Sequence, residues 1–188
     1  YLTNAALDVH ADDPEFGYRF IADELGDHGY AVSRNTVHSI CRDAGIVTAV
    51  HRRRGSGKKA GPPVHDDHVQ RDFTADAPDR VWLTDITEHW TGEGKLYLCA
   101  IKDVFSNRIV GYSIDSRMKS SLAVAALEQA VARRSLSGAD LTGLTCHSNR
   151  GSQFRSRSFV TALNRHGIRG SMGRVGAAGD NAAMESFF

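Results

Sequence analysis

The chain has 188 residues, of which 41% are hydrophobic and 24% are charged. These proportions are typical of a soluble globular protein, and the length allows one full domain and a smaller one. No apolar run approaches the roughly 18 residues that span a bilayer, and the first residues lack a signal-peptide pattern, so we expect no membrane partner. The three cysteines are scattered and never form C-x-x-C, which indicates reduced thiols rather than a disulfide framework.

The formal net charge is only +1, but it is unevenly distributed along the chain. Residues 1–50 carry three arginines and eight acidic residues, whereas residues 51–63 carry five basic residues and no acidic one. The basic residues are Arg52, Arg53, Arg54, Lys58 and Lys59. Glycine, serine and proline occupy much of the rest of this stretch, so residues 51–78 predict a flexible linker. A basic linker is suited to contacting phosphates of a nucleic acid, and a solvated hinge is the alternative.

The stretch before the linker, residues 1–50, predicts a small helical segment with two short helices over residues 16–45. Ser33 is a suitable N-cap for the second of these helices, whose apolar residues fall on one side. The opposite side carries three polar candidates for contacts with DNA bases: Arg34, Asn35 and His38. In a helix-turn-helix this side enters the major groove, where Arg and Asn read base edges. A two-helix connector with a solvated polar face is the alternative, and because the local charge is acidic both interpretations stay open.

From residue 79 onward the pattern changes to alternating strands and helices. The strand-like runs are rich in β-branched and aromatic residues, and the helical runs repeat apolar residues every three or four positions. The expected order is three strands (Val81–Trp90, Lys95–Phe105, Arg108–Asp115), a helix (Ser120–Arg134), a strand (Leu144–His147), a helix (Ser156–His166) and a strand (Ile168–Met172). Composition and periodicity alone therefore indicate an α/β domain over residues 79–188.

Asp85 is the first candidate site residue, because it lies within an apolar strand between Leu83 and Ile86. An isolated buried charge is costly, so this carboxylate requires a partner. A divalent metal ion is the preferred candidate, since hard cations bind carboxylate oxygens. A local hydrogen bond is the alternative.

Four short motifs occur in order along the second half of the chain. They are W-x-T-D-I-T at 82–87, H-S-x-R-G-S-Q-F at 147–154, G-S-M-x-R-x-G at 170–176 and D-N-A-x-x-E-S-F-F at 180–188. Thirty-five residues separate Asn149 from Glu185. This pattern resembles the DDE transposases of bacterial insertion sequences, whose catalytic core is similar to that of retroviral integrases. The resemblance covers residues 16–188.

The resemblance implies a ribonuclease-H-like fold, a mixed five-stranded sheet flanked by helices and preceded by the helix-turn-helix-like segment. It implies that Asp85, Asn149 and Glu185 converge as the catalytic and metal-binding residues, with Mg²⁺ or Mn²⁺ as the cofactor. Two such ions activate the attacking oxygen and stabilise the leaving oxygen in phosphoryl transfer. Arg150 and Arg174 are further candidates for contacts with DNA, and loop structuring is an equally good role for Arg150. Because members of the family continue past the final Phe-Phe, we expect the catalytic core to be C-terminally truncated.

One letter departs from the pattern, because the family has a second aspartate where this chain has Asn149. An amide offers one carbonyl oxygen but no negative charge, so we expect an impaired metal site. The function expected from the resemblance is metal-dependent cleavage and transfer of DNA strands during transposition, impaired by Asn149. A catalytically dead relic that only binds DNA or multimerises is the alternative.

The expected partners are double-stranded DNA, further copies of the chain and a smaller helix-turn-helix protein from an upstream frame, in the bacterial cytoplasm. The loose set of His38, Cys41, His65 and His68 lacks a second cysteine and does not favour zinc.

Overall fold

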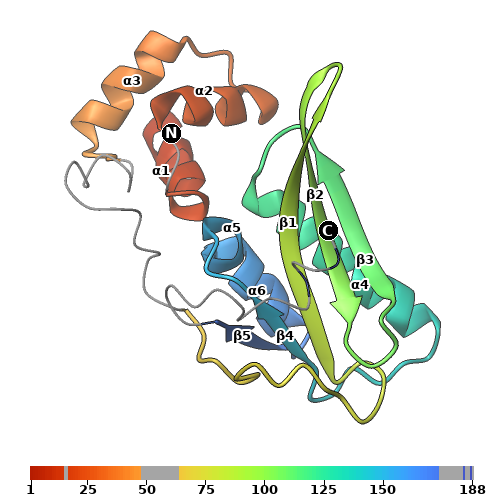
Figure 1. Ribbon diagram of the computed structural model, residues 1–188. Coiled ribbons are helices and arrows are strands. Elements are labelled where there is room, and N and C mark those ends of the chain that lie inside the picture. The colour runs from red at the N-terminus through yellow and green to blue at the C-terminus, as the bar shows by residue number, and fades with distance from the viewer. Residues whose placement is uncertain (15–16, 48–63, 174–183, 185–186, 188) are drawn as a thin grey trace. The chain divides into compact units, whose positions relative to one another are not determined.

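The computed structural model describes residues 1–14, 17–47, 64–173, 184 and 187, and the chain divides into two compact units, Tyr1–Lys59 and Ala60–Phe188 (Figure 1). The predicted linker of residues 51–78 straddles this division. Its basic residues, Arg52, Arg53, Arg54, Lys58 and Lys59, lie outside the described residues.

The first unit consists of three helices, α1 (Leu2–Asp12), α2 (Tyr18–Asp27) and α3 (Arg34–Asp43). Ser33 caps α3 as predicted, because its side chain accepts a hydrogen bond from the Thr36 N–H at 3.1 Å. The helices share a small core of apolar side chains: Ala6, Val9, Ile21, Ala22, Leu25, Val37 and Cys41. The sequence pattern did not predict α1. This helix buries only two small side chains, Ala6 and Val9, which give a weak periodic signal.

The second unit is built on a five-stranded sheet. Its strands are β1 (Val81–Thr91), β2 (Gly94–Asp103), β3 (Ile109–Asp115), β4 (Thr145–Ser148) and β5 (Arg169–Met172). Their order in the sheet is β3-β2-β1-β4-β5. The pairs β1–β2 and β2–β3 are antiparallel, whereas β1–β4 and β4–β5 are parallel. The predicted mixed five-stranded sheet is therefore confirmed.

Helices α4 (Ser120–Leu136), α5 (Ser152–Arg155) and α6 (Arg157–Arg165) complete this unit (Figure 1). The short α5 was not predicted. The α4 helix lies very close to β3, and the contact point is Gly111. A Cβ atom at this position would lie 2.5 Å from the Ala126 carbonyl oxygen and 2.6 Å from the Ala130 Cβ. The main core fills the same side of the sheet and includes Trp82, Leu127, Phe154 and Phe159, all fully or almost fully buried.

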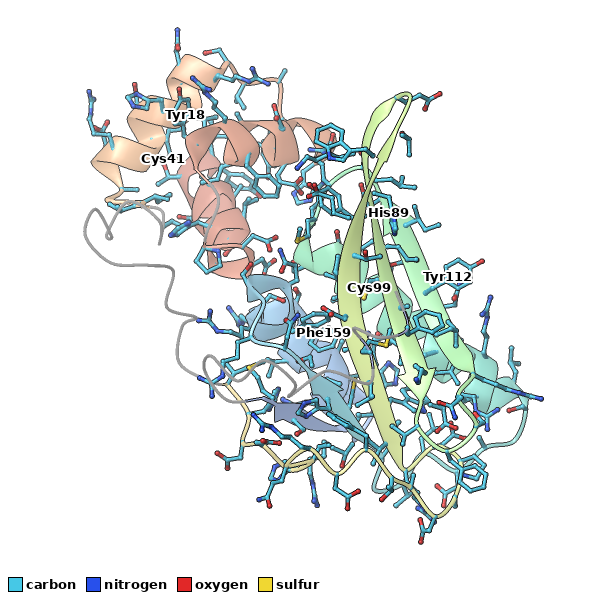
Figure 2. All side chains as sticks on the ribbon, in the orientation of Figure 1. Tyr18, Cys41, His89, Cys99, Tyr112 and Phe159 are labelled. Atoms are coloured by element: carbon cyan, nitrogen blue, oxygen red, sulfur yellow. The ribbon has the colours of Figure 1, made fainter. Side chains whose placement is uncertain are left out.

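All three cysteines are free and buried, and Figure 2 labels Cys41 in the first unit and Cys99 in the second. Burial raises the pKa of Cys99 to about 12, and it raises the pKa of Cys146 to about 12 as well. These thiols stay protonated near neutral pH, so they supply neither a nucleophile nor a thiolate ligand. Within the described part of the chain, no helix combines the length and the apolar character needed to cross a membrane.

Candidate active site

The register of β1 and β4 brings two of the predicted site residues together. The parallel pairing runs to Thr84 opposite Ser148, so the next residues are Asp85, still within β1, and Asn149, the first residue after β4. The Asn149 Nδ2 donates a hydrogen bond to the Asp85 Oδ1 at 2.7 Å, although the residues are 64 positions apart. Asp85 is half-buried, whereas Asn149 is exposed. The two side chains are therefore in contact, and their catalytic role remains a prediction.

The orientation of the Asn149 amide is fixed by a second contact. Its Oδ1 accepts a hydrogen bond from the Gly151 N–H at 2.7 Å, and only the oxygen of an amide can accept. The Nδ2 must therefore face Asp85. The Asp85 Oδ1 also accepts the backbone N–H of Ile86 at 2.8 Å, so two donors converge on one carboxylate oxygen.

This arrangement does not fit a divalent cation between Asp85 and Asn149. Such an ion needs oxygen lone pairs from both partners, and Asn149 presents amide hydrogens to Asp85 instead. Among the residues that the structure describes, no three histidines, cysteines or acidic residues are grouped so as to hold a metal ion. Two predicted site residues, Glu185 and Arg174, lie outside the described residues.

The loop that follows Asn149 is tied to the end of β5. The Arg150 Nε donates to the Gly173 carbonyl oxygen at 2.6 Å, and the Gly173 N–H donates to the Ser148 carbonyl oxygen at 3.2 Å. Further along, the Gln153 Nε2 donates to the Met118 carbonyl oxygen at 3.1 Å. Arg150 thus has the loop-structuring role that was one of its two expected roles, and its contact with DNA remains a prediction.

A buried polar pair supports the same loop from within the sheet. The His147 Nδ1 and the Ser171 Oγ are hydrogen-bonded at 2.9 Å, and the Ser171 Oγ also accepts the His68 N–H at 2.9 Å. His147 is 1% exposed and lies directly opposite Leu83 in the parallel register. The sequence did not reveal Ser171 as a partner, because nothing local to either residue signals a contact across 24 positions.

The face of the sheet that carries Asp85 also receives Met184. This side chain is fully buried in a small cluster with Leu83 and Ala100. Side chains alternate between the two faces of a strand, so Leu83 and Asp85 point to the same side of β1. The residue that immediately precedes Glu185 is therefore packed on the Asp85 face of β1.

The residues predicted to read DNA bases lie on the exposed side of α3. Arg34, Asn35 and His38 are all exposed, as expected from the helical pattern. The Arg34 Nη2 forms an ion pair with the Asp23 Oδ1 at 3.0 Å. The His38 ring packs edge-on against the Tyr18 ring, with their centroids 4.7 Å apart. Figure 2 labels Tyr18 on the helix before the turn.

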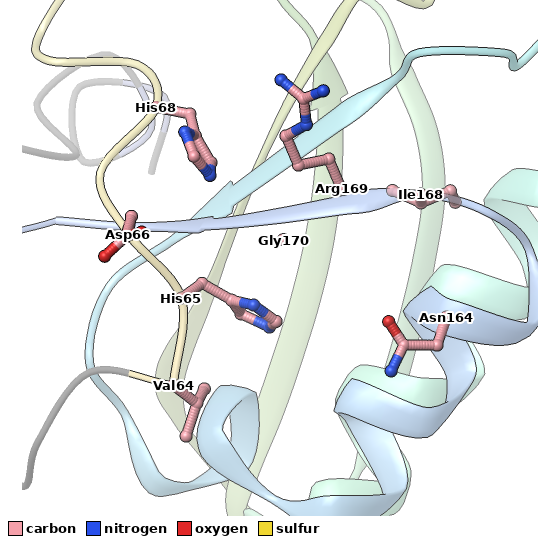
Figure 3. A pocket seen from close by; sticks show the side chains of 8 residues that line it. All are labelled: Val64, His65, Asp66, His68, Asn164, Ile168, Arg169 and Gly170. Atoms are coloured by element: carbon pink, nitrogen blue, oxygen red, sulfur yellow. The ribbon is translucent and has the colours of Figure 1, made fainter.

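A separate hollow of about 390 Å³ lies beside β5, away from Asp85 and Asn149. It is lined by Val64, His65, Asp66, His68, Asn164, Ile168, Arg169 and Gly170 (Figure 3). The His65 ring covers Gly170, where an added Cβ would lie 2.4 Å from the ring. Burial lowers the pKa of His65, and His68 lowers it further, whereas Asp66 raises it. The Asp66 carbonyl oxygen also accepts the Met172 N–H at 3.2 Å, so this segment is fixed to the outer strand of the sheet.

Comparisons with known proteins define the class. Residues 75–178 match the family model described as "Integrase core domain", and residues 2–54 match the model described as "HTH-like domain". The chain therefore belongs to the integrase core domain family and also carries an HTH-like domain. This family is metal-dependent.

The relatives place the chain more closely. It is 35% identical to transposase InsF for insertion sequence IS3A of Escherichia coli K12 over 175 residues, which cover 92% of this chain and 59% of the relative. It is 32% identical to the putative transposase InsK for insertion sequence element IS150 of the same organism over 184 residues, which cover 95% and 62%. The chain thus spans about three fifths of the length of these relatives. The predicted resemblance to insertion-sequence transposases is confirmed.

The fold comparison agrees. A chain in the cryo-EM structure of the simian T-cell lymphotropic virus intasome, in complex with PP2A regulatory subunit B56 gamma, matches with a TM-score of 0.52 and 17% identity. The match covers 92% of this chain and 53% of that chain. At this identity the likeness concerns the fold alone, and with the mixed five-stranded sheet it confirms the predicted ribonuclease-H-like fold.

Proposed function

We propose that the chain is the DNA-binding and catalytic-core region of an insertion-sequence transposase of the DDE type, in which Asn149 impairs the chemistry. Such a region binds double-stranded DNA and acts on it by metal-dependent strand cleavage and strand transfer. In this proposal Asp85, Asn149 and Glu185 occupy the places of the three acidic residues. The single observation that carries it is the 2.7 Å contact between Asp85, within β1, and Asn149, the first residue after the neighbouring parallel strand β4.

Two further observations support these places. Met184 is buried on the face of β1 that carries Asp85, which favours Glu185 as the third acidic residue. Asp103, another acidic residue of the sheet, is already committed elsewhere, because its two oxygens accept hydrogen bonds from Asp79 and Ser106. Asp103 is therefore a poor replacement for the missing second carboxylate.

Double-stranded DNA is the proposed partner of both units. Arg34, Asn35 and His38 form an exposed polar surface on α3, and the basic residues of 52–59 would add contacts with phosphates that are insensitive to sequence. Arg150 and Arg174 are proposed to contact DNA near Asp85. Assembly of several copies on DNA, and cooperation with a smaller protein from an upstream frame, belong to the same proposal.

A second candidate function is that of a DNA-binding or multimerisation module without catalytic activity. The Asn149–Asp85 hydrogen bond favours it. Asn149 lacks the negative charge of the aspartate that the family has at this place, and its Nδ2 also occupies the Oδ1 of Asp85. The two candidates differ only in residual strand transfer, so one assay separates them.

The test is strand transfer by the chain after it has been extended to the length of its relatives. The substrate is duplex DNA that carries the ends of the encoding element. We expect Asn149→Asp to raise Mg²⁺-dependent strand transfer by roughly 10³-fold or more, since losing one catalytic residue costs several orders of magnitude. Adding Asp85→Asn to that variant should abolish the gain. Equal, robust activity with and without Asn149→Asp would show that Asn149 does not occupy the place of the second acidic residue.

A further inference from the structure

We infer that the Asn149 amide replaces a metal ion as the partner of Asp85, so that the Asp85–Asn149 pair needs no cation between its two side chains and excludes one. The inference rests on the proposed function only in placing Asn149 where the family has its second acidic residue. It concerns the stability of the second unit and its binding of metal ions, and it does not depend on catalysis.

Three hydrogen bonds link Gly151, Asn149, Asp85 and Ile86, and we call them the Asp85 relay. The Gly151 N–H donates to the Asn149 Oδ1 at 2.7 Å, and the Asn149 Nδ2 donates to the Asp85 Oδ1 at 2.7 Å. The Ile86 N–H donates to the same Asp85 oxygen at 2.8 Å. Each end of the amide therefore has a partner of the correct kind.

Both partners of the Asp85–Asn149 hydrogen bond disfavour a cation between them. The Asp85 Oδ1 already accepts two hydrogen bonds, and the side of Asn149 that faces it carries hydrogens. Turning the amide over would present an oxygen to Asp85, but it would also place the amide hydrogens against the Gly151 N–H. Both new contacts would be repulsive, because donor would face donor and oxygen would face carboxylate. A cation between Asp85 and Asn149 would therefore break the Asp85 relay.

A carboxylate at position 149 would reverse this preference. It could still accept the Gly151 N–H, but it would present a second anionic oxygen to Asp85. Two carboxylates at this separation repel each other, and either a cation or a proton shared between them relieves the repulsion. The exchange of one NH₂ group for one oxygen thus converts a pair that is hydrogen-bonded by itself into a pair that a cation stabilises.

The test is thermal unfolding of the full chain in EDTA and in millimolar Mg²⁺ or Mn²⁺. Both tryptophans of the chain, Trp82 and Trp90, lie on β1, so their fluorescence reports the second unit. We expect the Tm of the natural chain to be the same in EDTA and with the ion. For Asn149→Asp we expect a Tm lower by about 5–10 °C in EDTA and a recovery on adding the ion, as for the loss of a hydrogen bond to a charged group.

Two variants make the result specific. Asn107→Asp makes the same chemical change at an exposed position between β2 and β3 and should not change the response of the Tm to the ion. The double variant Asp85→Asn with Asn149→Asp exchanges amide and carboxylate between the strands. It should regain the stability that Asn149→Asp alone loses in EDTA, and this holds even where Asn149→Asp alone does not fold.

The inference is overturned if the ion raises the Tm of the natural chain as much as that of Asn149→Asp. It is also overturned if Asn149→Asp is as stable as the natural chain in EDTA, or if the exchanged pair regains nothing. The proposed function fails on a different measurement, because it requires the chain to bind duplex DNA. A chain that does not bind DNA but shows the expected Tm pattern would retain the inference and lose the function.

Discussion

The two units of this chain hold their polar candidate residues in different ways. In the first unit, Arg34 pairs with Asp23 on the surface, and the two side chains are 64% and 45% exposed. In the second unit, Asp85 of β1 meets Asn149, the residue after β4, because the register of the two strands places them side by side. A surface ion pair contributes little and is easily exchanged for another partner, whereas a contact fixed by register changes only when the sheet changes. We therefore expect substitutions at Arg34 or Asp23 to leave the fold of the first unit stable. The Asp85–Asn149 contact should instead depend on the packing that holds the sheet of the second unit.

The largest expected effect is that of Gly111→Ala in the second unit. The added Cβ would meet the backbone of α4 at Ala126 and Ala130, which cannot move without displacing the helix. We expect a loss of about 3 kcal/mol in the free energy of unfolding, at the upper end of the usual cost of overpacking. Denaturant unfolding followed by tryptophan fluorescence measures it.

The matched control is Gly170→Ala, where the obstructing group is the His65 ring. A side chain can swing away, so we expect a loss of only about 1 kcal/mol. Equal losses of stability for the two variants would show that the close approach of α4 and β3 contributes no special share of the free energy of unfolding.

An intermediate effect is expected for DNA binding by the first unit. Arg34→Ala should weaken binding to a labelled duplex by about tenfold, within the range for one contact to a base. Asp23→Ala should strengthen binding by about two- to fivefold, because it frees Arg34 from a surface ion pair worth up to about 1 kcal/mol. Fluorescence anisotropy at fixed salt measures both. If neither substitution changes the affinity, α3 does not contact DNA and the exposed polar face is only solvated.

The smallest expected effect is a gain in stability from Gly26→Ala. This glycine lies within α2, and an added Cβ would meet nothing within 4 Å. Alanine should stabilise the helix by about 0.5–1 kcal/mol, because it loses less backbone entropy on folding. Far-ultraviolet circular dichroism during denaturant unfolding reports the change. Gly29→Ala is the contrasting control and should destabilise the unit, because Gly29 has φ of +84°. A gain at both positions would contradict this explanation.

The sequence by itself determined the order of the five strands and of helices α4 and α6 in the second unit, and the helix α3 that Ser33 caps in the first. Those features depend on residues a few positions apart, such as the apolar repeat over α4 and the Ser33 side chain at the start of α3. Asp85 could be recognised in the same way, because an acidic residue between apolar neighbours on one strand requires a partner. The family motifs then supplied the name of the fold.

Only the tertiary structure decided what Asp85 contacts. The parallel pairing of β1 with β4 joins residues 64 positions apart, and no local pattern specifies which amide or carboxylate will face Asp85. The same is true of the His147–Ser171 contact and of the segment around His65 that is fixed to β5. The orientation of the Asn149 amide depends on one further contact, the Gly151 N–H, which exists only once the loop after β4 has folded. Periodicity is a property of neighbouring residues, whereas the geometry of this site is a property of strand register.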